Sequence, residues 1–241
     1  MQICVEKLEL VAELLRPGLR ELSRIVDGSL SDSAIGLVVF GKATTGDFDA
    51  TKDTARTVLV VERIDLAGLK RLAAEGPRLG RHAITAPLIM TPEHIAASLD
   101  TFPLEFIEIQ QRNVVLFGDD HFAPLVFHDE HVRLQCEREL KTAMIALRQG
   151  LLASAGDVKM LTTVAGNVVQ GLIRILRGIL WLKGERSPQS LRNLVELSER
   201  QTTCRLPGLH RAIGLSANIS WDDFESLYAD VAALERAVDS W

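Results

Sequence analysis

The residues best suited to chemistry include carboxylates that gather in one short loop. Asp47 and Asp49 flank a phenylalanine, and Asp53 follows closely. Hard divalent cations prefer oxygen ligands, so these side chains are candidates for a relocated metal site with a catalytic role. Aspartate also favours solvated turns, and an irregular loop rarely holds metal geometry unaided. We therefore prefer the turn interpretation to the metal site.

A second pair of acids lies in an apolar stretch. Glu105 and Glu108 stand three residues apart. On a strand they would face opposite sides, which argues against a joint role as general acid and base, although one of them could still point into a cleft. The simpler interpretation is two polar positions on a half-exposed strand.

Histidines and acids also gather near the middle of the chain. His121, His128 and His131 lie among Asp119, Asp120, Asp129 and Glu130. No HExxH pattern is present, and acids at a helix start interact favourably with the helix dipole. We therefore predict no metal site in this cluster.

Composition narrows the class of protein. The chain has 241 residues, a formal net charge of -5 and a sequence pI of about 5.7, so it carries no electrostatic footprint for nucleic acid. The three cysteines are scattered and lack CxxC spacing, which predicts reduced thiols in a cytoplasmic protein.

Arg174 and Arg177 interrupt the most apolar stretch, so a bundle helix is preferred there to a membrane span. These arginines would pair with neighbouring acids or line a cleft for an anion.

Apolar periodicity predicts the elements that must position these residues. Strands are expected over 34–40, 57–62 and 84–90, with further apolar runs at 106–109 and 114–117. Helices are expected over 5–26 with a break at Pro17-Gly18, then over 66–74, from Thr91-Pro92, over 131–155 and 157–183, and from Ser187-Pro188 and Ser220. A turn is expected over 28–33. This pattern indicates an α/β (α+β) chain, with a small mixed sheet in residues 1–125 and an all-helical bundle in residues 126–241.

The order of these pieces resembles a known superfamily. A strand that ends in Phe40-Gly41, an acidic loop and a second strand containing Leu59-Val-Val-Glu62 resemble the DNA polymerase beta-like nucleotidyltransferases. The segments 91–93, 102–109, 115–119 and 134–149 look like a bacterial branch of these proteins. The resemblance covers roughly residues 30–155, and the helical remainder fits the helical subdomain that such proteins often carry.

The resemblance also implies a site, and this chain departs from it. In the superfamily the first strand ends in Gly-Ser, which binds the triphosphate, and a later Asp-x-Asp holds two metal ions. Here Lys42 stands where the serine is expected, and Thr54 and Arg56 stand where the two aspartates belong. The stretch 84–90 offers no third acid. The implied ligand-binding residues are therefore Gly41, Lys42, Thr54 and Arg56, and the family's metal ligands are missing.

Three hypotheses for function follow. The first is a catalytically defective nucleotidyltransferase-fold protein that binds a nucleotide or another phosphorylated small molecule, or acts in regulation. The second is an active nucleotidyltransferase for a small molecule, with Mg²⁺ held by the loop aspartates or the two glutamates. The third is an interaction module whose helical half pairs with a partner or with itself as a homodimer. No other cofactor, and no nucleic-acid or membrane partner, is expected.

Overall fold

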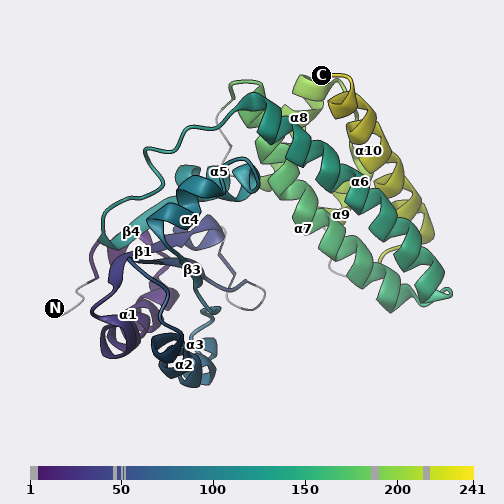
Figure 1. The fold of residues 1–241 in the computed structure, drawn as a ribbon. Coiled ribbons are helices and arrows are strands. Elements are labelled where there is room, and N and C mark those ends of the chain that lie inside the picture. The colour runs from purple at the N-terminus through teal and green to yellow at the C-terminus, as the bar shows by residue number, and fades with distance from the viewer. Residues whose placement is uncertain (1–4, 46–47, 50, 52, 186–189, 214–217) are drawn as a thin grey trace. The chain divides into compact units, whose positions relative to one another are not determined.

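The chain divides into two compact units. The computed structural model describes residues 5–45, 48–49, 51, 53–185, 190–213 and 218–241 (Figure 1). The first unit comprises residues 1–99 and 106–126, and the second comprises residues 100–105 and 127–241. The division between residues 105 and 106 falls inside one helix, α5 (Pro103–Gln111), which therefore contributes residues to both units.

A four-stranded mixed sheet forms the centre of the first unit. The strands are β1 (Ala34–Phe40), β2 (Arg56–Val61), β3 (Leu88–Met90) and β4 (Asn113–Gly118), in the order β3-β2-β1-β4. β1 pairs antiparallel with β2 and β4, whereas β2 and β3 are parallel. These observations confirm the expected fold class, a mixed α/β chain that continues as helices.

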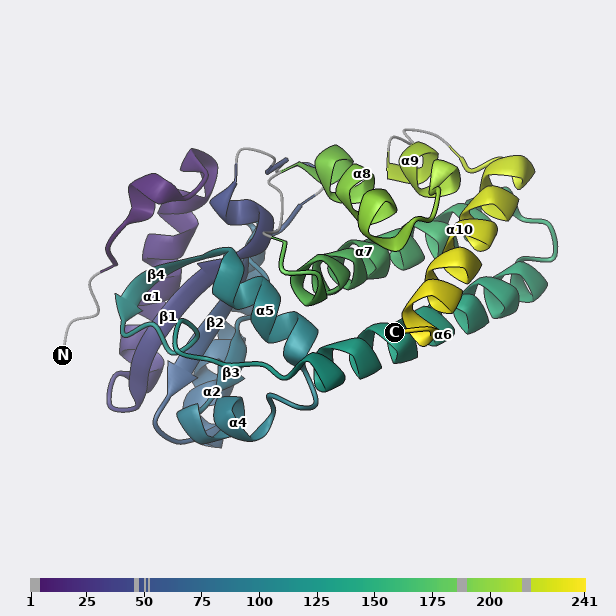
Figure 2. The same ribbon diagram turned by 90° about the horizontal axis from the view of Figure 1, so that it is seen from above.

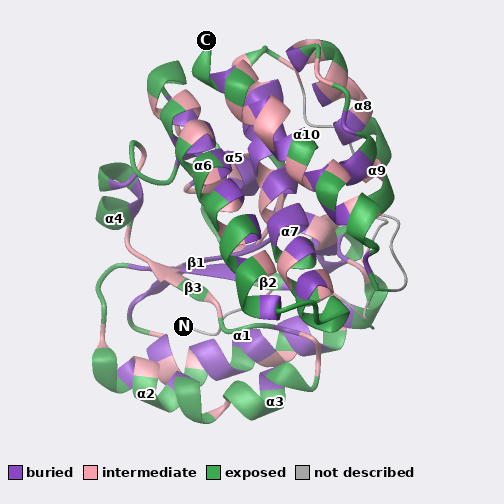
Figure 3. Cartoon of the chain, turned by 90° about the vertical axis from the view of Figure 1, so that its right-hand side faces the viewer, coloured by how far each residue is buried: buried purple, intermediate pink, exposed green. Residues whose placement is uncertain are grey.

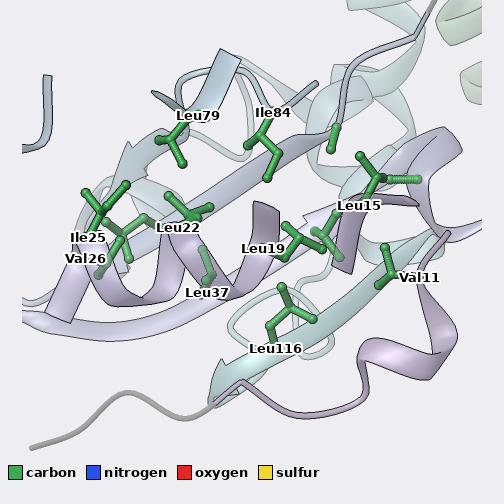
Figure 4. Close-up of a cluster of buried hydrophobic side chains, with 14 of the residues drawn as sticks. Val11, Leu15, Leu19, Leu22, Ile25, Val26, Leu37, Leu79, Ile84 and Leu116 are labelled. Atoms are coloured by element: carbon green, nitrogen blue, oxygen red, sulfur yellow. The ribbon is translucent and has the colours of Figure 1, made fainter. Parts of the chain in front are cut away.

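One face of the sheet is covered by helices α1 (Arg16–Leu30), α2 (Leu66–Ala74) and α3 (Gly76–Gly80). Alternate residues of the strands, such as Leu37 and Leu59, enter this core because successive side chains of a strand point to opposite faces. Figure 4 shows leucines of α1 directed toward Leu37 and Leu116. The other side chains of β1 and β2, including Phe40 and Arg56, therefore belong to the opposite face.

The expected helix over 5–26 is wrong in its bounds. Two short 3-10 turns, η1 (Leu8–Leu10) and η2 (Glu13–Leu15), precede α1, and Pro17 lies in the first turn of that helix. Proline has no backbone N–H, but the N–H groups of a helix's first turn have no partner within the helix. Pro17 is therefore compatible with the start of α1 and does not break it. α1 then continues through Gly28 to Leu30, which shortens the expected turn.

Two further expectations need correction. β3 spans only Leu88–Met90, and Ile84 forms an isolated bridge with Ala55, because Pro87 cannot donate to a sheet ladder. The apolar run that contains Glu108 is the helix α5 and not a strand. The helix expected after Thr91 is confirmed as α4 (Pro92–Ala97), where the Thr91 hydroxyl accepts the His94 N–H at 3.1 Å.

The second unit is helical. Beyond the first turn of α5 it consists of α6 (Asp129–Ser154), α7 (Val158–Leu182), α8 (Leu191–Thr202), α9 (Pro207–Ile213) and α10 (Trp221–Asp239). α6 packs against α7 and α10 (Figure 2), and α7 carries more buried apolar residues than any other described helix of the unit (Figure 3). Ser220 caps α10 as expected, whereas Ser187-Pro188 lies outside the described residues.

Among the described helices, none has the length and apolarity that crossing a membrane requires. Cys136 is buried, its pKa is raised mainly by that burial, and its Sγ lies 3.9 Å from the Ile175 carbonyl. Cys136 and Cys204 carry thiols, while Cys4 lies outside the described residues. Cys136 is therefore a neutral packing residue and not a thiolate nucleophile.

A buried carboxylate fastens the short helix α9 to α10. Asp230, which is 3% exposed, accepts the backbone N–H of Leu209 at 2.7 Å. Burial raises the pKa of this carboxyl to about 6, although the N–H bonds of Leu209 and Gly208 and the nearby Arg211 act in the opposite direction, and Glu199 adds to the rise. The folded protein therefore holds a proton on Asp230 more tightly than the unfolded chain does.

We predict that Asp230→Asn removes a pH-dependent loss of stability. Because the pKa of Asp230 is about 6 in the folded protein and near 3.8 otherwise, the free energy of unfolding decreases as pH rises from about 4 to about 6. The amide keeps an oxygen for the Leu209 N–H but carries no charge. Urea denaturation should therefore show a stability difference that grows in favour of the variant over this range. The exposed Glu225→Gln on the same helix is the control, and a pH-independent difference for Asp230→Asn would contradict the assignment.

Candidate functional site

A tight turn at the end of β1 forms the base of the site. Gly41 begins the 3-10 turn η3 (Gly41–Thr44) with φ of +76°, in the left-handed region that glycine adopts readily. Its N–H donates to the Arg112 carbonyl at 2.8 Å, and the Thr44 hydroxyl donates to the Gly41 carbonyl at 2.9 Å. The turn is therefore fixed both to itself and to the residue that follows α5.

The guanidinium of Arg56 lies beside this turn. Arg56 is the β2 partner of Phe40, and its guanidinium carbon lies 4.5 Å from the centre of the Phe40 ring. Its Nη2 donates to the Glu108 carboxylate at 2.5 Å. A Cβ placed on Gly41 would lie only 2.7 Å from the same Nη2. Arg56 thus occupies the space next to the glycine and is held there by an aromatic ring and a carboxylate.

The second cation of the site is also paired. The Lys42 ammonium lies 2.7 Å from the Asp53 carboxylate, which accepts the Asp49 N–H through its other oxygen at 3.1 Å. Asp49 is exposed and accepts the Thr51 N–H and hydroxyl at 2.9 and 2.7 Å, which is turn geometry. Asp47 lies outside the described residues. Asp53 is therefore a partner of Lys42, and Asp49 stabilises the loop.

The candidate acids Glu105 and Glu108 do not act together. They lie one turn apart on α5, and each contacts an arginine of a different unit. Glu105 pairs with Arg174 at 3.1 Å and accepts a hydrogen bond from Gln135 at 2.8 Å, both within the second unit. Arg174 also pairs with Glu139 at 2.8 Å. In the described structure this arginine therefore lies in a network of acids within the bundle.

The remaining candidates are the histidines and acids near the middle of the chain, and Thr54. Within the part of the chain that the structure describes, no group of three or more histidine, cysteine, aspartate and glutamate side chains is arranged to hold a metal ion. The His128 and His131 rings contact edge to face at 5.6 Å between their centres. Thr54 is exposed just before β2.

The contacts that hold the site in place join residues far apart in the sequence. The Arg56–Glu108 pair joins residues 52 positions apart, and the Gly41 N–H binds the carbonyl of Arg112. Neither contact follows from local periodicity. The one local signal is the i, i+4 spacing of Glu108 and Arg112, which a helix would place one turn apart, and the Arg112 N–H does bond to the Glu108 carbonyl at 3.1 Å.

Comparison with known proteins identifies the class of fold. No protein-family model and no curated protein matches the sequence. The structure is similar to that of spectinomycin adenyltransferase AAD(9) from Enterococcus faecialis, determined with ATP and spectinomycin. The TM-score is 0.57 at 10% identity, over 92% of this chain and 98% of that chain. The chain therefore has a nucleotidyltransferase-like fold, with a mixed α/β part followed by a helical part.

We predict that Gly41→Ala destabilises the protein and disturbs Arg56. An alanine at this φ costs about 1–2 kcal/mol of folding free energy, and its Cβ must also displace the guanidinium, 2.7 Å away. Gly28→Ala is the control, because no atom lies within 4 Å of a Cβ there and the position is helical. The control should stabilise α1 by roughly 0.5–1 kcal/mol in urea denaturation. Equal stability of Gly41→Ala and the wild type would show that the turn is assigned wrongly.

Proposed function

We propose that this protein is a nucleotidyltransferase-fold protein without nucleotidyl-transfer activity, and that it binds a nucleotide or another phosphorylated ligand through Lys42 and Arg56. One observation carries the proposal, namely the Arg56 guanidinium lying against Gly41. By resemblance, the position of Arg56 is one at which the superfamily has a metal-binding aspartate. The replacement puts a fixed positive charge where that chemistry needs a negative one.

This exchange of charge changes the chemistry that the site can support. Two-metal catalysis requires carboxylates that hold the ions between attacking and leaving oxygens. A guanidinium and an ammonium repel divalent cations but bind phosphate oxygens directly, and arginine does so with two parallel N–H groups. The side chains of Arg56 and Lys42 are 47% and 35% exposed, so an incoming anion can reach both.

A nucleotide is the first ligand to test. The similar adenyltransferase was determined with ATP, and its fold extends over 92% of this chain. We infer that ATP contacts Lys42 and Arg56 through its phosphates, and that this binding needs no metal ion.

Calorimetric titration of ATP, in magnesium and then in EDTA, tests this proposal. We expect binding in EDTA that magnesium leaves unchanged or weakens. The double variant Lys42→Ala with Arg56→Ala should lose affinity by about tenfold or more, because two charge-assisted hydrogen bonds are removed. The matched control is Lys70→Ala with Arg81→Ala, which removes the same charge from exposed positions elsewhere in the first unit.

Two results would contradict the proposal. Binding that requires magnesium would show a functional metal site. Release of pyrophosphate from a nucleoside triphosphate, abolished by Asp53→Ala, would establish the active enzyme.

A further inference from the structure

Both cations of the proposed phosphate site are already bound to carboxylates of the chain itself. Asp53 lies 2.7 Å from the Lys42 ammonium, and Glu108 lies 2.5 Å from the Arg56 guanidinium. Carboxylates offer the same kind of oxygen acceptor as phosphates do. Asp53 and Glu108 therefore occupy hydrogen-bonding positions that a phosphorylated ligand would also use.

The carboxylates are more deeply buried than their cations. The side chains of Asp53 and Glu108 are 14% and 7% exposed, against 35% and 47% for Lys42 and Arg56. Asp53 is further fixed by the Asp49 N–H, and Glu108 by its place on α5. A ligand from solvent thus meets the cations first, with the carboxylates behind them.

The charges of these four side chains sum to zero. Lys42 and Arg56 contribute two positive charges, and Asp53 and Glu108 contribute two negative ones. A single phosphate group would bind one of the two cations and would remain close to the carboxylate that is already paired with that cation. Two linked phosphate groups suit this pair of cations better, because Lys42 directly follows Gly41 in η3 and the Arg56 Nη2 lies 2.7 Å from where a Cβ on Gly41 would be. Two linked contacts then reinforce each other.

We propose that Asp53 and Glu108 are internal anions that hold the phosphate site in an autoinhibited state, which a diphosphate or triphosphate group relieves by binding Lys42 and Arg56 together. This inference rests on the proposed function and adds both a ligand class and a mechanism of control. It reverses the expectation for an active enzyme, in which removal of these acids would weaken ligand binding by removing metal ligands.

The test is calorimetric titration of inorganic pyrophosphate and of orthophosphate in EDTA. Asp53→Asn and Glu108→Gln keep shape and remove charge, so each should bind pyrophosphate about tenfold more tightly than the wild type. Glu62→Gln is the control, because it is exposed and follows the opposite end of β2 from Arg56. Orthophosphate should bind more weakly than pyrophosphate to every protein.

The outcomes separate this inference from the proposed function. If the wild type binds pyrophosphate in EDTA and Asp53→Asn binds it no more tightly, autoinhibition is refuted while phosphate binding stands. If orthophosphate binds as well as pyrophosphate, the two-group ligand is refuted. If no variant binds either anion, both proposals fail. Folding of Glu108→Gln is checked by thermal melting. If Glu108→Gln is unfolded, the affinity of Asp53→Asn for pyrophosphate alone decides whether the site is autoinhibited.

Discussion

A nearly buried carboxylate that stays ionised needs a cation or several hydrogen-bond donors beside it, and Glu108 meets this constraint with Arg56. Glu108 is 7% exposed on α5, and Arg56 meets its charge from the first residue of β2. The pairing draws the guanidinium across Phe40 and against the backbone of Gly41. No larger residue fits at Gly41 without moving Arg56, so this ion pair sets both the charge beside the turn and the space that the turn has.

The same arrangement decides what chemistry the fold can offer. A nucleotidyltransferase-like fold brings the end of β1 close to the start of β2, and here that meeting point presents cations backed by carboxylates. Under the function proposed here, these cations contact phosphate oxygens directly and no divalent ion is coordinated. α5 also contributes residues to the helical unit, where its first turn is held by Gln135 and Arg174. Glu108, one turn later, belongs to the first unit.

The parts of the fold that were predictable depend on local signals. β1 is a short apolar run in which three of seven residues are β-branched, and this pattern predicts the strand with the observed bounds. The helix caps at Thr91 and Ser220 are predicted as well, because a cap needs only neighbouring residues. α5 is not predicted, because a short apolar run has no period that separates a buried helix from a strand. In the site, motif comparison singled out Arg56, but its partner Glu108 lies 52 residues away and only the tertiary structure brings them together.

The central claim is that a fixed cation replaces a metal ion beside Gly41. A crystal structure of the protein grown with ATP and Mn²⁺, with manganese located by its anomalous scattering, tests this claim most directly. We expect phosphate oxygens bonded to Lys42 and Arg56, and no manganese coordinated by a protein side chain. A manganese ion held by the carboxylate of Asp53 or Asp49 would contradict the account.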